Sequence, residues 1–178
     1  LDAEALQRAV DVVVQHHDMF RARFKDEKSR QQVLAEKEEN QVLFHFDLTE
    51  MDKAAQTQEI EKRCGELQSS FDLSSGPIFI CAHFNLGDSS RLFVVVHHLV
   101  MDGVSWRILL EDIQTAYQQA QAGEEIHLPA KTTSFQYWAE QLTRFAQSQT
   151  VKDELDYWSF YERQLVAPIP VDFPEFRD

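Results

Sequence analysis

Two apolar segments separated by a turn constrain the fold of this chain more than any other feature. Residues 78–84 and 92–96 are rich in β-branched and aromatic residues, and residues 85–90 between them contain Asn, Gly and Asp. This pattern is typical of a β-hairpin. Residues 94–96 are three consecutive valines, which predicts a strand buried on both faces, since a half-exposed strand alternates apolar and polar residues.

The rest of the chain supplies helices and shorter strands. Asp2 is a suitable N-cap for the first helix, and Ser105 for the helix after the hairpin. Apolar residues recur at helical spacing over 1–17, 51–70, 105–122, 134–147 and 152–165, and they alternate over 20–24, 31–36 and 41–46. The expected fold class is α/β: an α+β two-layer sandwich with a mixed or antiparallel sheet covered by helices.

Composition excludes several classes of protein. With 43% hydrophobic residues and five each of Gly and Pro in 178 residues, the chain is globular rather than collagen-like or disordered. A formal charge of −13 disfavours nucleic acid as a partner, and no apolar run reaches the ~18 residues of a membrane span. Cys64 and Cys81 indicate neither a metal-binding quartet nor a secreted disulfide scaffold, so we expect inert thiols and a cytoplasmic location.

Residues 97–103, which read HHLVMDG, carry the strongest chemical signal. They follow the valine strand and precede a predicted helix, a position where a rigid element presents an exposed loop. Histidine, with an unperturbed pKa of ~6.5, can accept and return a proton at neutral pH. Because successive strand residues face opposite ways, His97 and His98 are expected to have different roles.

Three interpretations of this loop are open from the residues alone. The histidines could be hydrogen-bonded packing residues, or ligands of a metal site with Asp102, or groups for general acid–base catalysis. Adjacent histidines rarely converge on one ion and no fourth ligand occurs at a recognisable spacing, so no metal is expected. The second histidine pair, His16 and His17, ends the first helix and is interpreted as structural.

Three ordered motifs resemble one family. HHLVMDG resembles the HHxxxDG signature of the condensation superfamily of nonribosomal peptide synthetases, which has the chloramphenicol acetyltransferase-like fold. Residues 16–24, HHDMFRARF, are similar to its HHDxLRxRF segment, and residues 71–78, FDLSSGPI, to its FDLxxGPL segment. Within the superfamily, GVSWRILLED at 103–112, KTTSFQYWA at 131–139 and LDYW at 155–158 resemble epimerization domains more than peptide-forming condensation domains.

The resemblance implies a reaction. An epimerization domain inverts the Cα of an aminoacyl or peptidyl thioester from L to D by deprotonation and reprotonation. The thioester is held on the phosphopantetheine arm of a carrier protein, and no cofactor is bound directly. His98 would transfer the proton, and a glutamate of the C-terminal lobe would be its opposite partner. The alternatives are a condensation domain that forms a peptide bond and a non-catalytic carrier-docking module.

The resemblance also implies supporting roles around His98. His97 would be structural, and Asp102 would pair with Arg21, with Arg23 as the alternative partner. Gly103 would keep the thioester channel open, unless it simply occupies a positive-φ turn. Ser105 and Trp106 mark the subtype and could border the pocket.

Residues 1–178 would then be the N-terminal lobe of an epimerization- or condensation-type domain. The start of the first strand and the whole C-terminal lobe would lie outside this sequence, and residues 166–178 would cross over to the second lobe. Half an active site is not expected to act alone. The expected partners are the C-terminal lobe, a carrier domain and the neighbouring synthetase modules, in a pathway of antibiotic-type secondary metabolism.

Overall fold

The computed structural model describes residues 1–26, 31–162 and 172. The chain divides into two compact units, Leu1–Lys131 and Thr132–Asp178, which we call the core unit and the helical unit. The predicted α/β class is confirmed, because the core unit contains a mixed sheet packed against helices.

The central sheet contains three strands: β3 (Leu43–Asp47), β4 (Phe79–Asn85) and β5 (Ser90–Val96). Their order is β3-β4-β5, with β3 parallel and β5 antiparallel to β4. The predicted hairpin is therefore present, but its first strand is the buried one. β4 lies between two neighbours and is buried along nearly its whole length, whereas the valines of β5 lie at the sheet edge and are half-buried.

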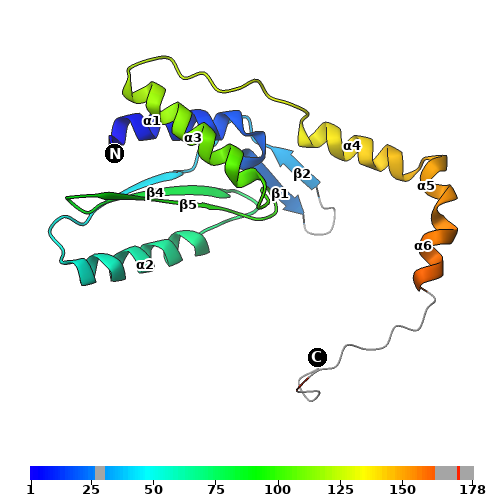
Figure 1. The fold of residues 1–178 in the computed structure, drawn as a ribbon, viewed down its shortest axis with the longest axis horizontal. Helices are drawn as coiled ribbons and strands as arrows, with labels where there is room; N and C mark the ends of the chain where they lie inside the picture. Colours follow the sequence, from blue (N-terminus) through cyan, green and yellow to red (C-terminus); the bar gives the residue numbers. More distant parts are fainter. Residues whose placement is uncertain (27–30, 163–171, 173–178) are drawn as a thin grey trace. The chain divides into compact units, whose positions relative to one another are not determined.

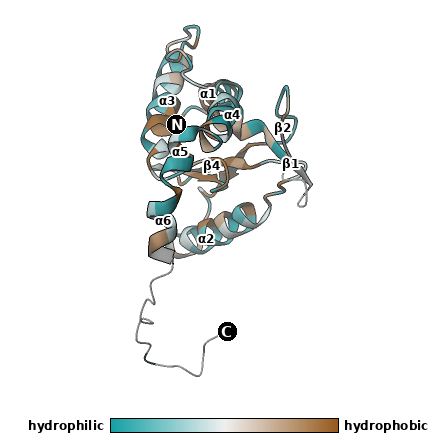
Figure 2. Ribbon diagram, turned by 90° about the vertical axis from the view of Figure 1, so that its right-hand side faces the viewer, coloured by the Kyte–Doolittle hydropathy of each residue, from teal (hydrophilic) through white to brown (hydrophobic). Residues whose placement is uncertain are grey.

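Helices cover both faces of this sheet, so the core unit has three layers rather than the two that were predicted (Figure 1). α1 (Ala3–His16) and α3 (Ser105–Gln121) lie on one face, and α2 (Lys53–Ser69) lies on the other. Alternate residues of β4 serve the two layers: Phe79 and Cys81 pack with α1 and α3, whereas Ile80 and Phe84 pack on the side of α2. Figure 2 shows the resulting hydrophobic colouring along β4.

α1 leads directly into the first motif segment. The Asp2 carboxylate accepts a hydrogen bond from the Ala5 N–H at 2.7 Å, as predicted for the N-cap. After α1 a 3-10 helix, η1 (Asp18–Arg21), precedes β1 (Ala22–Asp26), which pairs antiparallel with β2 (Gln31–Leu34). The strand predicted from residue 20 therefore begins later, and Phe20 instead stacks on Phe79 with ring centroids 4.6 Å apart.

Gly76, in the turn before β4, packs against a buried arginine. Its φ is +81°, and a Cβ at this position would lie 2.5 Å from the guanidinium carbon of Arg23. Gly76→Ala is expected to lower the free energy of unfolding by about 2–4 kcal/mol, combining about 1–2 for left-handed backbone with about 1–3 for overpacking.

Urea unfolding monitored by circular dichroism measures this effect. Gly65→Ala is the matched control, because Gly65 lies inside α2 and a Cβ there meets nothing within 4 Å. That substitution should leave stability equal or slightly raised, by up to about 1 kcal/mol. Equal unfolding midpoints for the two variants would contradict the tight packing around Gly76.

The helical unit contains α4 (Phe135–Ala146), α5 (Gln149–Asp153) and α6 (Leu155–Glu162). α4 agrees with the predicted helix, but the single helix predicted over 152–165 is wrong over its described part. Ser148 caps a new helix by accepting a hydrogen bond from the Val151 N–H, and that helix ends at Asp153. Residues 163–165 and, except for Asp172, the predicted crossover at 166–178 lie outside the described residues.

Large apolar side chains of α4 and α6 are exposed: Phe135, Tyr137, Trp138, Leu142, Phe145, Leu155, Tyr157, Trp158 and Phe160. Among the described residues, no helix is long and apolar enough to cross a membrane.

Candidate functional site

The HHLVMDG loop joins β5 to α3 and is fastened to the sheet. The His97 N–H donates to the Ile78 carbonyl at 2.9 Å, which extends the β4–β5 pairing one residue past the end of β5. The Val100 N–H then donates to the His97 carbonyl at 3.1 Å and turns the chain. The loop therefore begins from a rigid base.

His97 is fixed by contacts with neighbouring residues. It is half-buried, and its ring lies edge-on to Phe71 with centroids 5.8 Å apart. The Leu99 N–H donates to its Nδ1 at 3.2 Å. A nitrogen that accepts a hydrogen bond carries no proton, so neutral His97 has its proton on Nε2.

His98 has the opposite tautomer and is exposed. Its Nδ1 lies 2.6 Å from the Met101 carbonyl oxygen. Because a carbonyl oxygen only accepts, Nδ1 must donate, and in neutral His98 the lone pair is therefore on Nε2. The hydrogen bond also fixes the plane of the ring. His98 thus presents a proton acceptor at the surface of the chain.

Asp102 caps α3. Its Oδ1 accepts hydrogen bonds from the N–H groups of Val104 and Ser105 and from the Ser105 hydroxyl, at 3.1, 2.9 and 2.7 Å. These bonds, the one from the Ser105 hydroxyl above all, lower the pKa of the Asp102 carboxyl. The prediction that Ser105 is the N-cap is wrong, because Ser105 is the first residue of α3 and Val104 holds the N-cap position, while the Ser105 hydroxyl donates to Asp102.

The predicted pairing of Arg21 with Asp102 is also wrong. Arg21 is buried and donates to the carbonyls of Val14 and Gln15 at 2.8 and 2.7 Å, and its guanidinium pairs with Asp18 at 3.0 Å. Those two carbonyls belong to the last turn of α1, where carbonyls lack helical partners. Arg21 therefore closes the C-terminus of α1.

The alternative partner, Arg23, is also engaged elsewhere. It donates to both carboxylate oxygens of Glu38, at 2.8 and 2.7 Å, and to the Ala22 carbonyl at 3.0 Å. Its side chain is 10% exposed and that of Glu38 4%. Both arginines of the motif thus support the fold beside α1 rather than the loop at Asp102.

Gly103 ends the HHLVMDG loop, and Trp106 lies in the first turn of α3. Gly103 is exposed, and a Cβ there would meet nothing within 4 Å. The positive-φ glycines among the described residues are Gly76, Gly87 and Gly123, so a positive-φ turn does not explain Gly103. Trp106 is half-buried and packs against the apolar cluster of α1 and α3.

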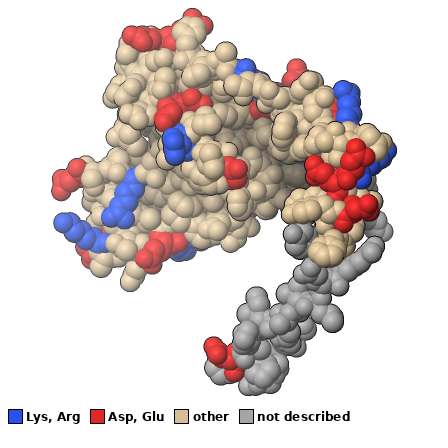
Figure 3. Space-filling view, turned by 45° about the vertical axis from the view of Figure 1, so that its right-hand side comes forward, with Lys and Arg blue, Asp and Glu red and all other residues tan. Residues whose placement is uncertain are grey.

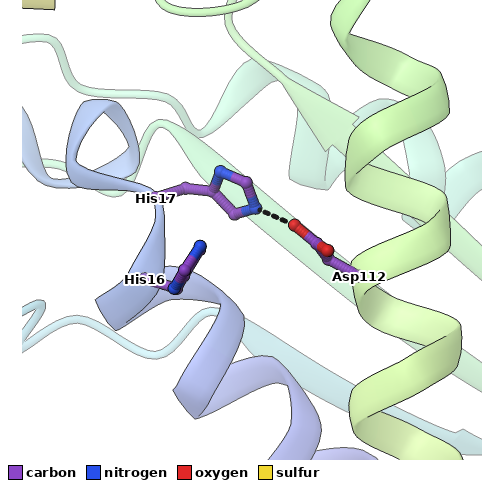
Figure 4. Close-up of side chains that lie close together, drawn as sticks. All are labelled: His16, His17 and Asp112. Atoms are coloured by element: carbon purple, nitrogen blue, oxygen red, sulfur yellow. Dashed lines mark hydrogen bonds and ion pairs between the residues drawn. The ribbon is translucent and has the colours of Figure 1, made fainter. Parts of the chain in front are cut away.

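A second polar cluster joins α1 to α3, and sequence reasoning missed it. His17 Nε2 and Asp112 Oδ2 are 2.8 Å apart, with His16 beside them (Figure 4). Burial lowers the pKa of His17 more than Asp112 raises it, so the imidazole is neutral at neutral pH. Asp112 is 95 residues from His17 along the chain. The sequence feature that could have indicated this contact is a charged residue, Asp112, on the apolar face of the predicted helix.

Neither the hollow beside residues 35–40 nor the two cysteines adds a group to the HHLVMDG site. A hollow of about 1220 Å³ lies beside Asp11, Gln15 and residues 35–40, and the HHLVMDG loop does not line it. Burial raises the pKa values of the Cys64 and Cys81 thiols, so both are protonated at neutral pH.

On the face of the core unit drawn in Figure 3, Lys and Arg side chains are scattered among Asp and Glu.

Comparison with known proteins finds one matching family, several relatives and solved structures of similar fold. The condensation domain family matches residues 1–176. One of the linear gramicidin synthase proteins of Brevibacillus parabrevis is 42% identical over 176 residues, which are 98% of this chain and 3% of that protein. The crystal structure of the epimerization domain from the third module of tyrocidine synthetase B matches with 36% identity and a TM-score of 0.87, covering 97% of this chain and 40% of that one.

A condensation enzyme shares the fold at lower similarity. The crystal structure of VibH, an NRPS condensation enzyme, matches with 22% identity and a TM-score of 0.66, covering 94% of this chain and 38% of that one. The chain therefore spans about two fifths of these solved chains and a small part of the gramicidin synthase protein.

Proposed function

The chain belongs to the condensation domain family, and from this premise we propose that it is the N-terminal lobe of an epimerization domain of a nonribosomal peptide synthetase. The proposed substrate is an aminoacyl or peptidyl thioester on the phosphopantetheine arm of a carrier domain. The observation that carries the proposal is His98, which is exposed and whose hydrogen bond to Met101 leaves Nε2 as proton acceptor.

In the proposed reaction, Nε2 of His98 takes the Cα proton of the thioester. The electrons of the C–H bond form an enolate whose negative charge rests on the former carbonyl oxygen. His98 becomes an imidazolium, and its Nδ1–H bond to the Met101 carbonyl stabilises that charge. A proton delivered to the opposite face by the glutamate of the second lobe completes the inversion, with no net oxidation.

The subtype proposal is supported by similarity. The solved epimerization domain matches at 36% identity, whereas the solved condensation enzyme matches at 22%. Condensation is the second candidate, because the matched family is described as a condensation domain. In that reaction Nε2 of His98 would accept a proton from the amine of the acceptor aminoacyl group as the amide bond forms.

A chirality assay separates the two candidates. A complete two-lobe domain that contains this chain would be given one carrier loaded with an L-aminoacyl group, and the thioester would then be hydrolysed. We expect a mixture of D and L amino acid. A product of unchanged L configuration, together with a dipeptidyl thioester when a second loaded carrier is added, would instead identify a condensation domain.

Gly103→Ala tests the thioester channel. Because a Cβ at Gly103 meets nothing within 4 Å, the variant should unfold at the same urea concentration as the wild type. In the complete domain we expect turnover to fall by at least about 10-fold, since a small misplacement of substrate is costly to rate.

The control for this substitution is Gly65→Ala, a glycine equally free of contacts but remote in α2. Normal turnover of both variants would show that no substrate group passes Gly103. The partners in this proposal are the C-terminal lobe, the carrier domain and the neighbouring modules.

A further inference from the structure

The end of α1 turns two adjacent histidines toward one residue of α3. Adjacent histidines rarely converge on one ion, but here α1 ends at His16, and the extended backbone of its C-cap His17 (φ −87°, ψ 95°) places the two rings side by side. The two rings have centroids 5.1 Å apart and planes at 82°. One ligand atom each from His16, His17 and Asp112 all lie within 4.8 Å of one another (Figure 4).

The charges at this cluster favour a cation. Asp112 is 6% exposed, and its carboxylate is hydrogen-bonded to the His17 imidazole, with Nε2 and Oδ2 2.8 Å apart. The nearby cations Arg21 and Lys131 both pair with Asp18. A buried carboxylate is normally paired with a cation or bound to a metal.

His16 adds free donor capacity. Within the described part of the chain its ring makes no hydrogen bond, although it is half-buried beside the His17–Asp112 pair. A neutral imidazole without a partner is the form that binds metals.

We propose that His16, His17 and Asp112 form a binding site for a divalent transition metal ion, with Zn²⁺ as the best fit. Two imidazoles and a carboxylate suit zinc, and a water completes the tetrahedron. Ligand atoms at ~2.0–2.2 Å from a tetrahedral ion lie about 3.4 Å from one another. The His16 ring would therefore move toward the other two side chains, whereas His17 Nε2 and Asp112 Oδ2, now 2.8 Å apart, would separate slightly. The ion replaces the hydrogen bond between His17 and Asp112, with the His17 proton moving to Nδ1.

The bound ion would cross-link the C-terminal end of α1 to α3, the helix that follows the HHLVMDG loop. This inference does not depend on the proposed reaction, because it concerns residues that touch no substrate in that proposal.

The test uses the full chain, with any histidine tag removed and metal stripped by a chelator. Zinc is titrated in competition with a chromophoric chelator, and cobalt absorption reports the coordination number. We expect one zinc per chain and a tetrahedral cobalt spectrum. His16→Gln and Asp112→Asn should each weaken zinc binding by at least about 10-fold, the loss typical of disturbed metal sites.

His127→Ala is the matched control, since His127 is an exposed histidine 3.6 Å from the carboxylate of Glu125; its zinc affinity should equal that of the wild type. His16→Gln keeps the test valid if Asp112→Asn fails to fold, because the His16 ring makes no hydrogen bond with the described residues. Absence of stoichiometric binding, or equal affinity in wild type and His16→Gln, would show a hydrogen-bonded cluster only.

Discussion

Replacing His98 by alanine in a complete two-lobe domain is expected to slow inversion of the carrier-bound Cα by about 10²–10⁴-fold, the contribution of a positioned general base. The substitution removes Nε2, the acceptor left free by the hydrogen bond to Met101. Folding should be little affected, because the His98 side chain is exposed. The rate of D-aminoacyl formation on the carrier measures the effect.

Two other histidine variants serve as controls for the effect of His98→Ala. His97→Ala should lower stability, because the ring packs on Phe71 and accepts a hydrogen bond from Leu99. His127→Ala, an exposed histidine outside the loop, should retain the wild-type rate. A His98→Ala domain that inverts its substrate at the wild-type rate would remove His98 from the chemistry.

Glu38→Ala is expected to lower the free energy of unfolding by about 3–5 kcal/mol, the usual loss when one partner of a buried ion pair is removed. Arg23 would keep its charge at a position where its side chain is 10% exposed, without the two carboxylate hydrogen bonds that now satisfy it. The unfolding midpoint in urea measures the loss.

Glu66→Ala provides the surface control. Glu66 also pairs with an arginine, Arg63, at 3.1 Å, but the two side chains are 50% and 37% exposed. Removing that pair should change stability by less than about 1 kcal/mol. If the two variants lose equal stability, burial of the Arg23–Glu38 pair has no energetic consequence.

The elements of the core unit followed from local sequence patterns. The Asp2 cap and the stripe of α1 predicted that helix, and the turn around Gly87 predicted the hairpin. These signals are local, because caps, turn residues and apolar periodicity act over a few residues. The valine run predicted burial on both faces but could not show that β5 lies at the sheet edge, since strand order is a long-range property.

Side-chain partners were harder to predict than elements. Asp102 was assigned an arginine partner but bonds to groups two and three residues along the chain. Arg21 was assigned to that loop but closes α1. The sequence contains several oppositely charged residues that could pair with each of these side chains. The folded backbone determines which of them lies within hydrogen-bonding distance. The tautomer of His98 likewise depends on the position of one carbonyl.

The most direct measurement of the central claim is Cα proton exchange in deuterated water. The complete domain, with one L-aminoacyl carrier and no second carrier, would be quenched at intervals, and the released amino acid analysed for mass and chirality. An epimerization domain with His98 as base predicts deuterium at Cα together with D configuration, and both should appear about 10²–10⁴-fold more slowly in His98→Ala. Unlabelled L amino acid from the wild-type domain, with amide formed once a second loaded carrier is supplied, would contradict the account.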